Sequence, residues 1–273
     1  MNSYRSLLYK ALYQGDSKQS RAGPVVWLPH QSITHDLRFG FPAITGRRFA
    51  FDVMAAELDC FIHGATNIDD FHARGCHIWD LNLKDFNART GRPDNKELGP
   101  IYGSAWRDFA GTGVDQLKWL TAEARRNPQS RRLLVTAWNP SDARDDTKVA
   151  LPPCHVMWQL SVSTGYADLC FYMRSVDLAL GLPFDIASYG LLLALICHEL
   201  GLKPRYVTGF LADAHIYVSN FGGVKEYLHR PEYPLALLEI NTQLGTPVTA
   251  FQKSHVSLRN YVSGDPIKMA MAV

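Results

Sequence analysis

The stretch between residues 151 and 201 limits the possible folds more than any other part of the chain. It ends in the apolar run IASYGLLLALICHEL, which follows Asp185 and stops at Gly201. This pattern is typical of a helix with an aspartate N-cap and a glycine stop. Cys154 and Arg174 lie earlier in the same stretch. A thiol, an arginine and acidic groups so close in sequence indicate covalent chemistry on an anionic substrate.

The composition fits one folded domain. With 273 residues, of which 47% are apolar, the chain can bury a full core, and it contains no internal repeat or low-complexity linker. Residues 1–273 are therefore expected to form a single α+β domain. The formal net charge of +2 gives no strong basic field, so nucleic acid is not expected as a partner, although a local arginine cluster could hold a small phosphate.

Cysteine use and hydropathy indicate a soluble cytoplasmic protein. The five cysteines include no CxxC pair and no zinc-ligand spacing, so reduced thiols and no bound metal are expected. The N-terminal segment lacks the continuous apolar core of a secretory signal. The longest apolar runs are too short and too interrupted to span a bilayer, so no membrane association is expected.

Periodicity and turn residues predict both helices and strands along the chain. Helices are predicted at 3–13, 49–64, 66–75, 113–126 and 222–230, strands at 25–37, 133–139 and from 234 onward, a strand and a turn within 203–220, and a loop or insertion at 81–97. This mixture is typical of the α+β class.

Cys154 is the first candidate for chemistry. Pro152 and Pro153 stiffen the chain before it, and nearby arginines would favour the thiolate that attack requires. The alternative is an inert buried cysteine, which is the commoner case. His155 is not assumed to be its base, because neighbouring residues on a strand point to opposite faces.

Several charged residues could lie either on the solvated surface or in a functional site. Arg131 and Arg132 lead into an apolar strand and Arg174 lies within FYMRSVDLALG, so each needs an anionic partner if it is buried. Glu57 stands among apolar residues of a predicted helix, where a buried carboxylate is uncommon unless it is paired or functional. The same two readings apply to Asp213, His215 and Tyr217.

Taken in order, the motifs resemble the folate-dependent thymidylate synthases that use a cysteine nucleophile. The matching segments cover nearly the whole chain and include RAG at 21–23, GFPAITGRRF, GATNI, HIWD, LGPIYG, NPQSRRLLVTAWN, LPPCHV, RSVDLALGLPFDIASYGLLL, LADAHIYVSN and PIKMAMAV. The resemblance implies an α+β homodimer built around a large bent mixed sheet with flanking helices, one sheet face forming the dimer interface. It also implies a deoxynucleoside monophosphate substrate and 5,10-methylenetetrahydrofolate as the one-carbon donor.

The resemblance also implies roles for individual residues. Cys154 would add to C6 of the pyrimidine, while Glu57, His155 and Tyr102 would organise water and proton transfer. The 5′-phosphate would be held by Arg21, Arg174 and Ser175, with Arg131 and Arg132 reaching across from the partner subunit. His215 and Tyr217 would bind the 3′-hydroxyl. The folate site would be lined by Ile78, Trp79, Leu151, Asp177, Gly181 and Phe184, and the carboxyl-terminal segment ending in Val273 would close over it.

Asp185 departs from the family pattern, because thymidylate synthases carry at this position an asparagine that pairs with uracil. Uracil offers an acceptor at O4 and a donor at N3, whereas cytosine offers a donor at N4 and an acceptor at N3. A carboxylate accepts from N4, and a proton on the carboxyl group or on N3 completes the second bond. The residue therefore predicts dCMP as the substrate, as in the similar deoxycytidylate hydroxymethylases, which are often found in phages that modify their cytosine.

The reaction that follows methylene transfer has two alternatives. Hydride transfer gives a methyl group and dihydrofolate, whereas addition of water gives a hydroxymethyl group and tetrahydrofolate. Trp79, His155 and the tail resemble the hydride-competent site. Hydroxymethylation is nevertheless the commoner activity among similar proteins with an aspartate at this position, and it is the prediction adopted.

Other departures leave further alternatives. Asp59, Met173 and Ala212 differ from the family pattern, and Asp59 could either support an extra water near Glu57 or face outward. An ordinary thymidylate synthase would require Asp185 to face away from the base. A catalytically silent paralogue is the weakest reading, since every candidate catalytic residue is present.

Overall fold

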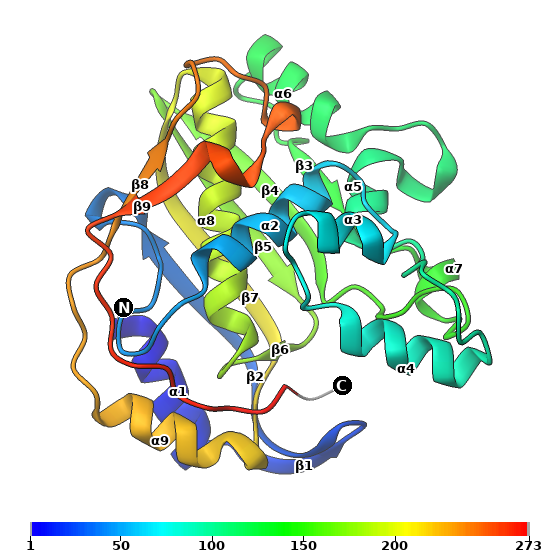
Figure 1. Cartoon of the computed structure of the whole chain (residues 1–273). Helices are drawn as coiled ribbons and strands as arrows, with labels where there is room; N and C mark the ends of the chain where they lie inside the picture. Colours follow the sequence, from blue (N-terminus) through cyan, green and yellow to red (C-terminus); the bar gives the residue numbers. More distant parts are fainter. Residues whose placement is uncertain (1, 272–273) are drawn as a thin grey trace.

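The core of the fold is one mixed sheet, seen in a computed structural model that describes residues 2–271. Within these residues seven strands follow the order β1–β2–β7–β5–β4–β3, with β6 beside β7 (Figure 1). The strands are β1 (Asp16–Ser20), β2 (Gly23–Asp36), β3 (Leu134–Thr136), β4 (His155–Ser163), β5 (Tyr166–Met173), β6 (Val176–Asp177) and β7 (Lys203–Tyr217), and β8 (Leu237–Ile240) pairs separately with β9 (Val256–Arg259). Strand β7 is parallel to β5 and β6, and the other pairs are antiparallel.

Helices flank the sheet, and α8 and α2 lie over one of its faces (Figure 1). The helices are α1 (Asn2–Gln14), α2 (Phe51–Ile62), α3 (Ile68–Ala73), α4 (Asp80–Thr90), α5 (Tyr102–Arg107), α6 (Gln116–Arg126), α7 (Pro140–Ala143), α8 (Gly181–Leu200) and α9 (Phe221–His229), with short 3-10 turns at η1 (Leu37–Phe39), η2 (Phe109–Gly111), η3 (Val218–Asn220), η4 (Val248–Ala250) and η5 (Lys253–His255). The expected α+β class with a mixed sheet and flanking helices is confirmed.

Helix α8 joins the core to the site. Its apolar residues pack on the sheet, where the ring of Tyr189 stacks on that of Phe171 at 4.3 Å between centroids. The predicted stop is confirmed, since Gly201 adopts the left-handed conformation and its N–H bonds to the carbonyl of Cys197. The predicted start was wrong: the helix begins at Gly181, and Asp185 lies inside it rather than at its cap.

The early start is possible because Pro183 stands in the first turn, where a backbone N–H has no intrahelical partner to lose. Because Asp185 lies in the second turn, its carboxylate does not cap the helix and can bond to other groups.

Helix α8 also corrects the reading of the longest apolar run. By length and composition alone, this helix is long and apolar enough to cross a membrane. The expectation that every apolar run is too short to span a bilayer was therefore wrong. However, 72% of its most apolar window is buried inside the structure, as expected for the core helix of a folded domain.

Two other local predictions were wrong. The segment predicted as a loop at 81–97 contains α4, whose largely polar sequence hides a helical period. That helix is supported by the Asp85–Arg89 ion pair across one turn and ends at Gly91 in the left-handed conformation. The predicted turn within 203–220 is absent, because β7 runs unbroken and pairs with β2 along most of its length.

Candidate functional site

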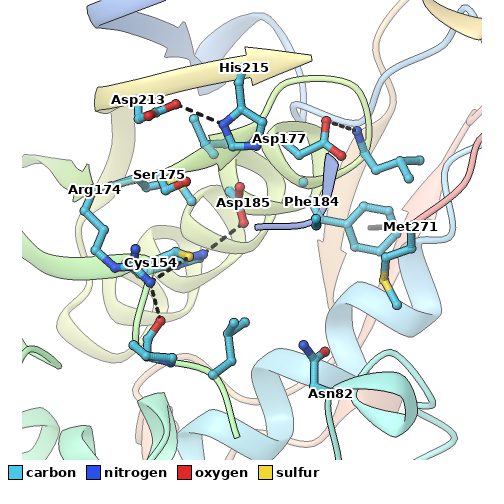
Figure 2. A pocket seen from close by; sticks show the side chains of 18 of the residues that line it. Asn82, Cys154, Arg174, Ser175, Asp177, Phe184, Asp185, Asp213, His215 and Met271 are labelled. Carbon is cyan, nitrogen blue, oxygen red and sulfur yellow. Dashed lines mark hydrogen bonds and ion pairs between the residues drawn. The ribbon is translucent and has the colours of Figure 1, made fainter. Parts of the chain in front are cut away.

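A cavity of about 910 Å³ opens among β1, α2, α4 and α8, and it collects most of the predicted site residues (Figure 2). This volume is in the range of sites that bury sizeable ligands. The residues that line it include Arg21, Glu57, Ile78, Trp79, Tyr102, Leu151, Cys154, His155, Arg174, Ser175, Asp177, Gly181, Phe184, Asp185, His215 and Tyr217. Arg131 and Arg132 do not line it and are exposed just before β3, and Val273 lies outside the described residues.

Cys154 is held at the cavity by its neighbours. Its backbone N–H donates to the hydroxyl of Tyr102 at 2.9 Å. The guanidinium of Arg174 donates to the carbonyls of Pro153 and Pro152 at 2.8 and 2.7 Å, and one of its nitrogens lies 3.7 Å from the sulfur. Burial raises the pKa of the Cys154 thiol, while the charge of Arg174 acts in the opposite direction. The arginine therefore positions the loop and favours the thiolate.

His155 lines the same cavity as the thiol, although neighbours on a regular strand would diverge. Cys154 precedes the first residue of β4, and the pairing of β4 with β5 is shifted between His155 and Met157. This irregularity turns both side chains toward one space. The alternation of side chains along a regular strand, which argued against His155 as the base for Cys154, therefore does not hold here.

Three polar side chains form a chain of hydrogen bonds beside the thiol. His155 Nε2 lies 2.9 Å from Asp185 Oδ1, and His155 Nδ1 lies 3.1 Å from the hydroxyl of Tyr189. If the hydroxyl donates to Nδ1, the imidazole donates from Nε2 to the carboxylate. Among the described residues, the second oxygen of Asp185 is buried without a partner. Such an acceptor is costly unless a donor reaches it.

Tyr189 was missed in the sequence. A signal was present, because residue 189 follows Asp185 by four positions and so shares its helix face. The apolar character of the surrounding run made it look like an ordinary core aromatic.

Glu57 meets the cavity from α2. Its Oε1 accepts from the indole N–H of Trp79 at 2.8 Å. Burial raises the pKa of Glu57 to about 7, although the bond from Trp79 and the charge of His155 oppose the shift and Asp185 adds to it. A carboxyl group with this pKa can donate and accept protons near neutral pH.

Replacing Glu57 with glutamine is expected to stabilise the protein increasingly as the pH rises above about 4.5, with the full gain above about pH 7. The folded protein holds the proton between the ordinary value of 4.5 and about 7, so wild-type stability falls as the pH rises through that window. Glutamine carries no charge and keeps an oxygen for Trp79. Urea unfolding near pH 8 should show a gain of about 3 kcal/mol, since each pK unit corresponds to about 1.4 kcal/mol, and almost none near pH 4.5. A gain independent of pH would contradict the raised pKa.

Asp59 does not line the cavity and is buried, so neither alternative left open for it, an extra water near Glu57 or an outward position, describes its place. Its carboxylate accepts from Arg74 Nε and from the backbone N–H of Lys253, both at 2.8 Å, and lies 3.0 Å from His63. It is 4% exposed, and it ties α2 to α3 and to η5.

Replacing Asp59 with alanine is expected to lower the free energy of unfolding by about 3–5 kcal/mol, because Arg74 would lose a buried partner. Urea unfolding measures the loss, and the preference between nucleotides should not change. The matched control is alanine at Asp69, an exposed aspartate paired with Lys96, which should cost less than about 1 kcal/mol. A small loss at both positions would show that the buried contacts of Asp59 contribute little.

The opposite wall of the cavity carries polar residues of β7. His215 Nδ1 lies 3.1 Å from Asp213 Oδ1 (Figure 2). The ring of Tyr217 stands perpendicular to that of His215, with 5.1 Å between centroids. Asp213, for which the sequence predicted no role, also forms an ion pair with Lys18 of β1. The three β7 residues line the cavity and are not ordinary turn residues.

A largely apolar wall completes the cavity near the end of the chain. Trp79, Phe184 and Met271 line it, and the carboxylate of Asp177 accepts from the N–H of Ala179 at 2.8 Å. The amide of Asn220 exchanges two hydrogen bonds of 2.9 Å with the backbone of Ala270, which holds the tail beside the cavity. An apolar wall with a few polar groups at its edge is typical of sites for flat aromatic ligands. Asn82 also lines this part of the cavity and was missed, because it lay in the segment expected to be a loop (Figure 2).

Comparisons with known proteins identify similarity to one family along the whole chain. A family model described as thymidylate synthase matches residues 2–273. A protein named thymidylate synthase, from Equine herpesvirus 2 (strain 86/87), is 37% identical over 287 residues, which cover 100% of this chain and 97% of the viral protein. The similarity therefore extends over every element that lines the cavity.

Proposed function

Because the chain belongs to the thymidylate synthase family, whose members use methylenetetrahydrofolate for one-carbon transfer to a nucleotide, we propose that it transfers this unit to C5 of dCMP. The product proposed is 5-hydroxymethyl-dCMP. In this reaction dCMP, methylenetetrahydrofolate and water give 5-hydroxymethyl-dCMP and tetrahydrofolate.

The second oxygen of Asp185 carries the proposal. It is buried, it has no partner among the described residues, and its carboxylate belongs to a residue that lines the cavity beside Cys154. The 4-amino group of cytosine supplies the donor that this acceptor requires. The 4-oxo group of uracil would instead place an acceptor against it, a mismatch that typically discriminates by a factor of about ten thousand.

The other catalytic residues have consistent places in this proposal. The Cys154 thiolate adds to C6, and the electrons released at C5 form the bond to the folate methylene group as one of its bonds to nitrogen breaks. Loss of the C5 proton and departure of tetrahydrofolate leave an exocyclic methylene group. Water adds to this group, and the bond between C6 and sulfur breaks to release the product. Glu57, with its pKa of about 7, exchanges protons with the base, and Tyr102 and His155 complete the polar network around the ring. In this proposal the folate is held by Ile78, Trp79, Leu151, Asp177, Gly181 and Phe184, which line the cavity. The segment ending in Val273, a residue outside the described part of the chain, would close over it.

The nucleotide's phosphate and sugar would occupy the polar part of the cavity. Arg21, Arg174 and Ser175 hold the 5′-phosphate in this proposal, and His215 and Tyr217 bind the 3′-hydroxyl. Arginine suits this role because its planar group binds phosphate oxygens through two parallel hydrogen bonds.

A second subunit would complete the phosphate site. Family members are typically homodimers, and Arg131 and Arg132 are exposed here and away from the chain's own cavity. In the proposed dimer they reach the partner's phosphate. The sheet offers a face for this contact, because the paired residues Tyr172 and Phe210 are 39% and 47% exposed.

Reductive methylation to 5-methyl-dCMP is the second candidate. The observation that favours it is Met271, which lines the cavity and would help to exclude the water that hydroxymethylation needs. The two products differ in their by-product, since only methylation oxidises the folate to dihydrofolate.

A direct assay tests the proposal. The protein is incubated with methylenetetrahydrofolate and with dCMP, dUMP or CMP, and the product is weighed by mass spectrometry. A gain of one formaldehyde unit on dCMP supports hydroxymethylation, and a gain of one methylene unit with a rise in near-ultraviolet absorbance indicates methylation. Faster conversion of dUMP, or no product from any nucleotide, would overturn the proposal.

A further inference from the structure

Two histidines and an aspartate meet outside the cavity, where α3 ends and α4 begins. His72 lies in the last turn of α3, His77 in the connecting loop, and Asp80 is the first residue of α4. Asp80 Oδ1 lies 2.7 Å from His72 Nε2, and Asp80 Oδ2 lies 3.2 Å from His77 Nδ1. The two imidazole rings lie 4.5 Å apart between centroids. One ligand atom of each residue lies within 4.8 Å of the other two.

We propose that these three residues form a binding site for a divalent transition-metal ion such as Zn²⁺. Two imidazole nitrogens and a carboxylate oxygen are ligands that this class of ion prefers. Bonds of about 2.0–2.2 Å to a shared ion require the ligand atoms to approach within about 3–4 Å of each other, and the two nitrogens already lie this close to the carboxylate.

The chain positions the ligands before any ion binds. His72 and Asp80 belong to different helices, and the loop that carries His77 brings them together. Each histidine directs one ring nitrogen at a different oxygen of the same carboxylate. An ordinary surface ion pair needs only one such contact, whereas two imidazoles and a carboxylate that converge offer a metal ion three protein ligands. All three side chains are exposed, so an ion and one or more waters can enter freely.

An ion at this position would act on the cavity through a short connection. The residues between His77 and Asp80 are Ile78 and Trp79, which line the cavity, and the Trp79 indole bonds to Glu57. Binding would cross-link the end of α3 to the start of α4 and so restrict the segment that carries both. We infer that the ion stabilises this wall of the site from outside, without contacting nucleotide or folate.

Metal titration of the full-length protein tests the site. Zn²⁺ binding is measured by calorimetry, and Co²⁺ is added separately to detect the visible absorption of a site with nitrogen ligands. The wild type should bind one ion per chain, and His72→Ala and His77→Ala should each weaken binding at least about tenfold, which corresponds to about 1.4 kcal/mol. Wild-type Tm should rise with saturating Zn²⁺, and the rise should be lost in both variants.

Two controls separate this site from other ligands. His229→Ala removes an exposed histidine on α9 and should leave metal binding unchanged. Cys154→Ala removes the thiol in the cavity, which could also bind Zn²⁺, and should leave metal binding unchanged. Unchanged binding in His72→Ala and His77→Ala, or loss of binding in Cys154→Ala alone, would overturn the proposal. So would the absence of any calorimetric or spectral change in the wild type.

Discussion

Asp185→Asn will transfer the preference of the protein from dCMP to dUMP. The amide replaces one carboxylate oxygen by an NH₂ group, which donates to the 4-oxo group of uracil and repels the 4-amino group of cytosine. Because buried mismatches of this kind discriminate by about 10⁴, the ratio of kcat/KM for the two nucleotides should change by at least about a thousandfold. Initial rates with each nucleotide, at saturating methylenetetrahydrofolate, measure the ratio.

The matched control is Asp213→Asn. This residue is also a cavity carboxylate with a histidine partner, but it lies on the wall proposed to bind the sugar. Its replacement should lower the rates with dCMP and dUMP by similar factors. An Asp185→Asn variant that stays active on dCMP and gains nothing on dUMP would show that Asp185 does not contact the base.

Cys154→Ala is expected to abolish turnover and to preserve nucleotide binding. Without the thiol no bond forms at C6, and C5 stays too weak a nucleophile to attack the folate methylene group. The rate should fall by at least about a thousandfold, while the dissociation constant for dCMP should change by less than about threefold, because the phosphate and base contacts remain. Product formation over hours and equilibrium binding of dCMP measure the two quantities.

A substrate analogue gives a second measurement of the same step. Fluorine at C5 of 5-fluoro-dCMP cannot leave as a proton does, so the covalent complex with Cys154 should accumulate and add the mass of nucleotide and folate to the intact protein. Cys170→Ala is the matched control, since this partly exposed thiol lies on β5 outside the cavity and should leave both activity and adduct unchanged. An adduct that persists in Cys154→Ala would place the nucleophile elsewhere.

Many of the residues that line the cavity could be predicted from the sequence, because they lie in short motifs with distinctive chemistry. Cys154 after two prolines, Arg174 beside Ser175, and Asp185 in an otherwise familiar segment could each be located by number, and all line one cavity. Their roles remain predictions. The fold class followed from the same motifs, because they occur in order along the chain.

The errors have a common physical origin in contacts that a linear pattern does not contain. Helix α4 is polar along most of its length, and contacts such as those of Arg89 with the carbonyls of Val149 and Ala150 secure it from a distant segment. Asp59 could be placed only once Arg74 and Lys253 were seen to meet it. Asp185 resembles an N-cap in sequence, but the helix begins one turn earlier, at Gly181, with Pro183 in its first turn.

The irregular start of β4 also bears on the kinetic step at which the protein should discriminate between nucleotides. Cys154, the proposed nucleophile, is adjacent to His155, whose ring bonds to the carboxylate of Asp185 that is proposed to read the base, and both lie at the irregular start of β4. A pyrimidine that sits poorly against Asp185 is consequently displaced with respect to the sulfur as well. Discrimination between nucleotides should thus be expressed mainly in the rate of carbon–sulfur bond formation, and the wrong nucleotide should behave as a competitive inhibitor that binds and reacts slowly.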